Sequence, residues 1–485
     1  MMLRSKSLRS PLVAGVGVAV LVSLAGCGDS GGGETSGGGG DDEPLASSIA
    51  DYAPTDANRD AFVAFEEELD QKYAGETLNI MGVNDPWLDS FSEMVSQFEE
   101  LTGSTVNFQG FSYDDTYSRE VLVGTEQDSS VDLVMYDLPW VGQFVETGLV
   151  EPLDSYIDAV DPELMMYDDL YQVMREGSTW NDQRYGIPFA PYFIMNISNT
   201  SLLEQAGIDA PPQTMDEFVE SCHTITDATG IAGTAINNQT GMAAGQAWFE
   251  FVYNMGGRAF ESMHPTTEGD YYENMTPRFD TPEARATAEM LKDLLSCQPE
   301  GAVNITWPER YSSFATGQAG MIAPWNYDIP PLNDSETSAV VDNYVVTPVP
   351  VADGVDRVTS VGGWELGINT ASTQKDFAFD FITWFSSPAV NAAFVDGGGF
   401  PARYSATENA DLQAKYPWLE VQAEIVDAAF PAFRPQVPEA FELMTIIGNN
   451  LGKYYADEVS LDEALEGAQT ELTDLLVGAG YTVDQ

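Results

Sequence analysis

The chain has 485 residues, with 77 Asp and Glu side chains against 19 Lys and Arg, and a formal net charge of −58. This length favours two lobes or domains, and contents of 44% hydrophobic and 11% aromatic residues exclude global disorder. The charge excludes a nucleic-acid-binding protein, because such a surface repels phosphates. Only six of the basic residues are lysine. This composition indicates adaptation to molar salt, where the Debye length is roughly 3 Å, although a merely acidic extracellular protein remains the alternative.

The first 26 residues resemble a lipoprotein signal peptide. A basic segment with Arg4, Lys6 and Arg9 precedes the apolar run 11–26, which is shorter than the roughly 20 residues that span a bilayer. The run ends in the tetrapeptide 24–27, LAGC. In signals of this family the chain is cut before the cysteine, which is then acylated, so the resemblance implies lipidation of Cys27. An ordinary signal peptide with a chance cysteine is the alternative.

Residues 27–50 predict a flexible acidic tether, because a stretch dominated by Gly, Ser, Asp and Glu buries nothing. A lipid, a tether and a globular body together describe a protein anchored at the outer face of the cell membrane. No later segment is long and apolar enough to predict a transmembrane helix. An archaeon and a salt-adapted bacterium both fit as the source.

Two cysteines lie in the body, Cys222 and Cys297, each in a helix-like segment. Export permits a disulfide, and two buried thiols are the alternative. The residues around these cysteines do not have the spacing of metal ligands, so we expect no metal site.

The body alternates strands and helices. Strands are predicted at 77–82, 105–108 and 131–136, with an amphipathic helix at 91–101 and another helix at 117–125. Repeated strand-helix-strand order predicts a mostly parallel sheet flanked by helices.

The segments after these three strands carry acids and aromatic residues. In parallel sheets ligands bind beyond the carboxyl ends of the strands. Carboxylates bind sugar hydroxyls and aromatic rings stack on sugar C–H faces, so these residues are candidate ligand contacts. They are Asp85, Trp87, Tyr113, Asp137 and Trp140.

Short motifs in a fixed order resemble those of ABC-transporter solute-binding proteins of the carbohydrate and polyol class (family 1, similar to maltose-binding protein). Each is weak alone, but together they extend over roughly residues 75 to 475. They are QRYGIPF at 183–189, GLVEPL at 148–153, GIDAPPQTMDEF at 207–218, FATGQAGM at 314–321, GGWELGI at 362–368, GGFPAR at 398–403 and LDEAL at 461–465. Met215 departs from the pattern, since relatives usually have Trp there.

The resemblance implies a two-lobed α/β periplasmic-binding-protein fold of type II, with a ligand held between lobes joined by hinge crossings. The first lobe is expected at 75–190 plus 358–412, and the second at 193–355 plus 413–485, with chain crossings near 190–196, 355–359 and 411–417. Hinge closure around the ligand would present the loaded form to the permease subunits of an ABC importer. We expect a monomer without cofactor.

By position in these motifs, Trp325 is the expected aromatic platform and Tyr192 the expected contact on the hinge side. Asp137 and Trp140 occupy the loop where relatives place a ligand-binding acid and an aromatic residue.

Trp364 and Glu365 lie in a glycine-flanked turn that is expected to face the cleft, although Trp364 is also suited to packing. Arg434 is expected to bind vicinal hydroxyls or to pair with Asp137 or Glu365. Gln239 follows a strand-like segment at 233–236, for which an amide-rich turn is the alternative.

These residue types favour a neutral sugar or polyol over a sugar phosphate. Oligosaccharide, monosaccharide and polyol all remain open, and a phosphodiester is a weaker candidate.

We expect a binding protein and no enzyme. The alternative is a secreted hydrolase with paired carboxylates, but with so many acids some pair meets any spacing. Nucleotide-binding, metalloprotease and serine-hydrolase motifs are missing, and the only histidines, His223 and His264, predict packing or surface roles. A third class, an acidic adhesion or cation-binding protein, lacks a calcium-loop motif.

Overall fold

The computed structural model describes residues 45–267 and 270–484, which contain two main sheets. Cys27 and the signal peptide lie outside the described residues. The first sheet has six strands in the order β12-β11-β3-β1-β2, with β6 also paired to β11. Its strands are β1 (Thr77–Val83), β2 (Thr105–Phe111), β3 (Leu133–Asp137), β6 (Ile187–Phe193), β11 (Thr359–Ile368) and β12 (Ala429–Phe430).

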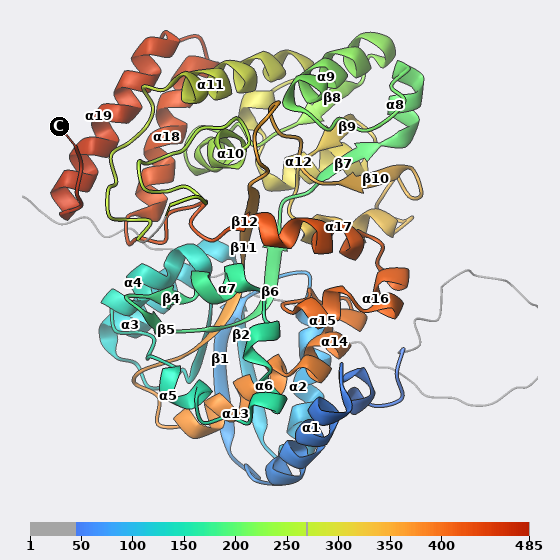
Figure 1. Cartoon of the computed structure of the whole chain (residues 1–485), viewed down its shortest axis with the longest axis vertical. Helices are drawn as coiled ribbons and strands as arrows, with labels where there is room; N and C mark the ends of the chain where they lie inside the picture. Colours follow the sequence, from blue (N-terminus) through green and yellow to red (C-terminus); the bar gives the residue numbers. More distant parts are fainter. Residues whose placement is uncertain (1–44, 268–269, 485) are drawn as a thin grey trace, which may run out of the picture. The chain divides into compact units, whose positions relative to one another are not determined.

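The second sheet has four strands in the order β10-β7-β9-β8. Its strands are β7 (Asn196–Asn199), β8 (Ala232–Ala235), β9 (Ala319–Ile322) and β10 (Tyr344–Thr347). A small hairpin of β4 (Thr179–Trp180) and β5 (Gln183–Arg184) is separate from both sheets. In Figure 1 the first sheet lies in the lower half, the second in the upper half, and β6, β11 and β12 run between them.

Helices cover both sheets, and we call each sheet with its helices lobe I and lobe II. The helices before and after the first sheet's strands are α1 (Asp56–Leu69), α2 (Leu88–Thr102), α3 (Tyr113–Glu126), α4 (Val141–Glu146), α5 (Asp154–Ile157), α6 (Pro162–Met165), α7 (Gln172–Gly177), α13 (Lys375–Ser386), α14 (Pro388–Asp396), α15 (Tyr404–Thr407), α16 (Ala410–Lys415) and α17 (Trp418–Ile425). Those of lobe II are α8 (Thr200–Ala206), α9 (Met215–Thr229), α10 (Met242–Val252), α11 (Pro282–Leu294), α12 (Trp307–Ala315), α18 (Ala440–Tyr455) and α19 (Leu461–Ala479).

The helix α2 illustrates how sequence periodicity becomes packing. Phe91, Met94, Val95 and Phe98 recur at helical spacing and are all buried against lobe I. The helix ends at Gly103, whose φ of 70° lies in the left-handed region that favours glycine. The helix therefore fixes the path of the chain from β1 to β2, which pair in parallel.

Strand pairing is more mixed than the sequence predicted. Parallel pairs join β1 to both β2 and β3, but β11 runs antiparallel to β3 and β6. In lobe II only β8 and β9 are parallel, while β7 is antiparallel to β9 and β10. The antiparallel strands lie next to the chain crossings. A strand that enters a lobe from a crossing runs in the opposite direction to a strand of the same lobe that leads toward the crossing.

The first crossing falls between β6 and β7, within the predicted segment 190–196. The chain returns between β10 and β11, close to the predicted return near 355–359. The strand β12 pairs with β11 of the first sheet, although it belongs to the segment 413–485 that we expected in the second lobe. The exact lobe boundaries stay a prediction.

The predicted tether is too long at its C-terminal end. A 3-10 helix (Ile49–Tyr52) packs on α14, and the backbone N–H of Leu45 donates to Asp396 at 3.0 Å. The Tyr52 hydroxyl donates to the same carboxylate. Residues 45–50 are therefore attached to lobe I, because Leu45 at their start and Tyr52 just after them both bond to Asp396 of α14.

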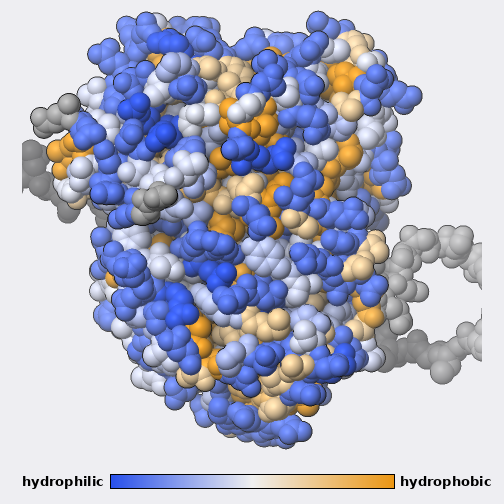
Figure 2. All heavy atoms as spheres, in the orientation of Figure 1, coloured by the Kyte–Doolittle hydropathy of each residue, from blue (hydrophilic) through white to orange (hydrophobic). Residues whose placement is uncertain are grey.

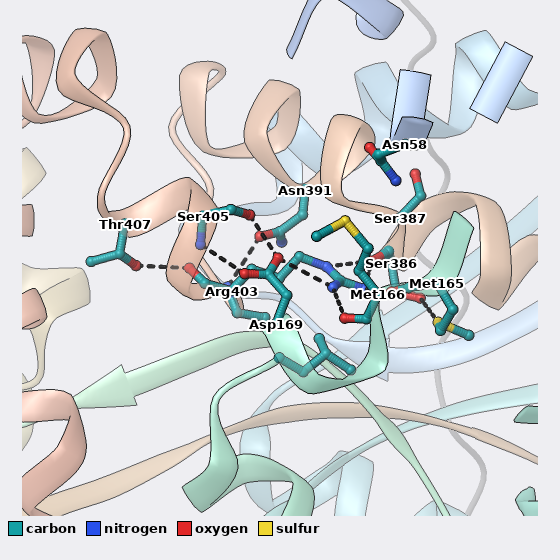
Figure 3. A network of polar contacts seen from close by, with 12 residues as sticks. Asn58, Met165, Met166, Asp169, Ser386, Ser387, Asn391, Arg403, Ser405 and Thr407 are labelled. Carbon is teal, nitrogen blue, oxygen red and sulfur yellow. Dashed lines mark hydrogen bonds and ion pairs between the residues drawn. The ribbon is translucent and has the colours of Figure 1, made fainter. Parts of the chain in front are cut away.

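A buried polar network holds together distant parts of lobe I (Figure 3). The guanidinium of Arg403 donates to the carbonyls of Ser386, Met165 and Met166 at 2.5 to 2.9 Å, and to Asp169 at 3.4 Å. Asp169 also accepts from the backbone and hydroxyl of Ser405. Arg403, from the predicted GGFPAR motif, is completely buried and thus serves the fold.

The surface is mostly hydrophilic on the face drawn in Figure 2, with scattered hydrophobic patches. None of the helices in the described part of the chain has the length and apolar character to cross a membrane.

Candidate ligand-binding site

A cavity of about 370 Å³ lies between the two lobes. Lobe I and its crossing strands supply Asp85, Ser112, Tyr113, Asp114, Asp137, Tyr192, Gly362, Gly363 and Trp364. Lobe II and the late loop before α18 supply Met242, Gln246, Trp307, Trp325, Tyr327, Arg434, Phe441 and Met444. Because both lobes form its walls, a hinge motion would open and close it.

Asp137, at the end of β3, is the most heavily hydrogen-bonded acid in the cavity. Its carboxylate accepts a hydrogen bond from Arg434 Nη2 at 3.1 Å, and its Oδ2 forms an ion pair with Arg434 Nη1 at 3.0 Å. It also accepts from the Tyr113 hydroxyl at 2.7 Å and from the backbone N–H of Gly363 at 3.1 Å. A carboxylate has about four lone-pair sites, and these three hydrogen bonds and the ion pair occupy both of its oxygens.

Arg434 packs against aromatic rings in addition to pairing with Asp137. Its guanidinium lies 5.6 Å from the ring of Trp325 and 5.2 Å from that of Phe433. Burial alone would disfavour its charge, but the Asp137 carboxylate outweighs burial and raises the pKa of Arg434 above its ordinary value. A Cβ at Gly362 would lie 2.6 Å from the Arg434 Nη2, so only glycine leaves room for the ion pair.

Asp85, in the loop after β1, accepts two hydrogen bonds on one oxygen. Its Oδ2 accepts from the Tyr192 hydroxyl at 2.8 Å and from the Trp364 Nε1 at 2.6 Å. Burial raises the pKa of Asp85 to about 6, against the lowering effect of these bonds, and the charge of Asp137 raises it further. The side chain is nevertheless partly exposed to the cavity, so a ligand can reach the carboxylate.

Aromatic rings form most of the remaining wall. Trp364 packs edge-on against Tyr113 and Trp140, with ring centroids 5.9 and 5.6 Å apart. Across the cavity, Phe441 of α18 lies 6.2 Å from Tyr113. Rings that enclose a carboxylate suit a solute with C–H faces and hydroxyl groups.

Seven of the eleven predicted contacts line the cavity: Asp85, Tyr113, Asp137, Tyr192, Trp325, Trp364 and Arg434. The predicted pairing of Arg434 with Asp137 is present, whereas Arg434 makes no ion pair with Glu365 in the described residues.

Four predicted contacts lie elsewhere. Trp87 and Trp140 are completely buried and pack against other aromatic rings, Trp87 with Phe91 and Phe189. Gln239 is exposed, and its backbone is bonded to Ile305 and Ala244. Each follows a strand as predicted, but none of the three lines the cavity.

The prediction that Glu365 faces the cavity is wrong, for a geometric reason. Successive side chains of a strand point to opposite faces, so Trp364 and Glu365 of β11 cannot both face the cavity. Glu365 is completely buried near Tyr136, and burial raises its pKa well above the ordinary value.

Sequence reasoning missed most of the lobe II wall. Tyr327 lies two residues after Trp325, and Ser112 and Asp114 flank Tyr113. Their proximity in sequence to predicted contacts could have identified these three residues. The other missed residues, on α10, α12 and α18, read as ordinary core positions of amphipathic helices. These residues are Met242, Gln246, Trp307, Phe441 and Met444.

Cys222 and Cys297 form a disulfide, with Cα atoms 5.9 Å apart. It joins α9 to the 3-10 helix after α11, well away from the residues of the cavity. Within the described ranges, no group of three or more His, Cys, Asp or Glu side chains is arranged to hold a metal ion.

The chain belongs to the family of bacterial extracellular solute-binding proteins, whose model matches residues 84–392. A probable amino-acid ABC transporter periplasmic-binding protein from Sinorhizobium fredii is 23% identical and covers 85% of this chain and 92% of its own length. The mannitol-binding protein of Pseudomonas aeruginosa is 24% identical and covers 84% and 94%.

The structure is similar to that of an ABC-transporter solute-binding protein from Agrobacterium radiobacter K84 in complex with ribitol. The TM-score is 0.73 at 28% identity, covering 83% of this chain and 99% of that one. The predicted family and the two-lobed α/β fold are thereby confirmed. The family is one of binding proteins and is extracytoplasmic.

Proposed function

We propose that this protein captures a small neutral polyol or monosaccharide between its lobes and delivers it to an ABC importer. The observation that supports this most directly is the cavity between the lobes, in which the Asp85 carboxylate lies among aromatic rings. A volume of about 370 Å³ is near the lower end of the ~300–1,000 Å³ typical of ligand pockets, which favours one sugar unit over an oligosaccharide. The mannitol-binding relative and the ribitol complex support the polyol class.

Delivery to a permease follows from differential binding. Only the closed form brings both walls to the solute, so solute binding stabilises closure. A permease that recognises the closed form would then respond to loaded protein. We further propose that Cys27 is acylated and holds a monomeric body at the outer face of the membrane, in molar salt.

Catalysis is not expected from this cavity. A hydrolase needs two carboxylates free to exchange protons or attack the sugar. Asp137 is engaged by Arg434, Tyr113 and Gly363, and the third acid that lines the cavity, Asp114, is exposed to solvent.

Intrinsic tryptophan fluorescence tests the proposal, because Trp325 and Trp364 both line the cavity. The purified full chain in molar salt is titrated with ribitol, D-mannitol, D-glucose and maltose, and each mixture is examined for products. We expect a saturable change with a polyol or monosaccharide, none with maltose, and no turnover. Trp325→Ala should abolish the response. Trp384→Phe, which alters a buried ring of α13 outside the cavity, is the matched control and should retain it. Product formation would replace the transport proposal with the hydrolase.

A further inference from the structure

We propose that of Asp85 and Asp137, the two acids hydrogen-bonded within the cavity, it is Asp85 that binds the solute, and that its unpaired charge makes the site reject solutes that carry a carboxylate. Asp137 and Arg434 neutralise each other and fasten the loop before α18 to β3. This division of roles rests on the proposed function and narrows its solute class. It also departs from the expectation that Asp137 is the ligand-binding acid.

The first support is that protein donors fill more of the hydrogen-bonding positions of Asp137 than of Asp85. Asp137 accepts three hydrogen bonds, one of them from Arg434, with which it also forms an ion pair. A hydroxyl of the solute would have to displace one of these donors to bind it, and each displaced donor would be left buried. The hydrogen bonds from Tyr192 and Trp364 both fall on Oδ2 of Asp85, so Oδ1 can accept from a solute without displacing either donor.

The second support is charge. Asp85, Asp114 and Asp137 line the cavity against a single cation, Arg434, and Asp85 forms no ion pair with any cation of the described residues. Closure around a solute removes water from Asp85, and an unpaired buried charge is costly unless a donor reaches it. A hydroxyl or an ammonium group supplies that donor, whereas a carboxylate adds a second negative charge.

Gln246 strengthens the same preference on the lobe II side. Its amide nitrogen donates to Glu250 at 2.8 Å, which leaves its carbonyl oxygen as the available acceptor. The walls therefore present acceptors from both lobes. Where closure around a solute excludes water and ions, molar salt should screen this field less than it screens the outer surface.

The test uses two series that share a carbon skeleton: D-glucitol, D-gluconate and D-glucamine, and ribitol with D-ribonate. Affinities are measured by calorimetry on the full chain at pH 7.5 and constant molar salt. For the wild type we expect a neutral polyol to bind and its acid to bind at least about 100-fold more weakly, with the amine no worse than the polyol. Asp85→Asn should weaken polyol binding about 10- to 100-fold and narrow the ratio of polyol to acid affinity.

Asp137→Asn is the matched control, since it removes one charge from the same cavity. It should lower the melting temperature without solute and, by freeing Arg434, favour the acids. Asp85→Asn should leave that temperature equal or higher, so a folding defect cannot mimic the proposed effect.

Two results separate the proposals. If a polyol binds but Asp85→Asn retains its affinity, or if the wild type binds the acids as well as the polyols, the role of Asp85 is wrong and the transport function stands. If neither D-glucitol nor ribitol binds, the polyol function fails, and the inference fails with it.

Discussion

Two buried arginines lie in contrasting environments. Arg403, inside lobe I, donates to three backbone carbonyls and to Asp169, and Asp169 is itself bonded by Ser405 (Figure 3). Arg434, beside the cavity, has one carboxylate partner, and its Nε has no partner in the described structure.

The protonation behaviour of the two arginines follows from these partners. Burial lowers the pKa of Arg403 to about 10, with Asp169 opposing the shift, whereas Asp137 raises that of Arg434. Backbone carbonyls carry only partial charges, so they compensate a buried cation less than a bidentate carboxylate does. The network at Arg403 therefore holds chain segments in place, and the group at Arg434 leaves hydrogen-bonding capacity beside the solute site.

The largest effect is expected from Arg403→Met. The substitution leaves several buried carbonyls and Asp169 without their donor, so the free energy of unfolding should fall by about 3 to 5 kcal/mol. Denaturant titration at fixed salt measures it. Solute affinity of the folded fraction should be unchanged, and a loss below about 1 kcal/mol would show that the network is not structural.

A smaller loss is expected from Asp137→Asn. The asparagine can keep its contacts with Tyr113 and Gly363, and water from the cavity can reach Arg434, so we expect a loss of about 1 to 3 kcal/mol. The same denaturant titration compares it directly with Arg403→Met. An effect as large as that of Arg403→Met would contradict the contrast between the two regions.

Asp85→Asn should change stability in the opposite direction. The folded pKa of Asp85 is raised from 3.8 to about 6, so its favourable contribution is present below pH 3.8 and is lost as pH rises through 6. Relative to the wild type, the variant should gain about 1 to 3 kcal/mol above pH 7, from 1.36 kcal/mol per pKa unit, and the gain should vanish near pH 4. Thermal melts from pH 4 to 8 measure it, and a gain independent of pH would exclude Asp85 as its source.

The smallest effect is expected from Tyr192→Phe, which removes one of the two donors to Asp85. The free energy of unfolding should fall by about 0.5 to 1.5 kcal/mol at pH 8. The pKa of Asp85 should rise further, because the lost hydrogen bond favours its charged form. The pH at which solute affinity is half lost, measured by calorimetry, should therefore move upward, and an unchanged midpoint would contradict the role of this bond.

The sequence located the lobe I half of the site well, because strand ends are local features. Asp85, Tyr113 and Asp137 follow three strands that pair in parallel, and parallel strands bring their carboxyl ends to one edge. It failed at Trp87, which follows the same strand as Asp85 but turns into the core. The direction of a loop side chain depends on packing that no spacing rule contains.

For Glu365, a rule that needs only the sequence would have shown that the predictions for it and for Trp364 could not both be right. Alternation along a strand allows only one of two neighbours to face the cleft, and the structure selects Trp364. The irregularity in the pairing of β11 with β6 leaves Phe189 of β6 as the extra residue, while β11 keeps a regular register with β3 at both positions.

By itself, the sequence determined the alternating α/β pattern, the ordered family motifs and the acidic composition, since each depends on residues close together in the chain. The tertiary structure decided that Asp137 is paired with Arg434 while Asp85 keeps an available oxygen. Asp137 and Arg434 are almost 300 positions apart, and only the folding of β3 and the loop before α18 against each other brings their charges into contact. In the same way, α10 and α18 supply their share of the wall only because the lobes meet.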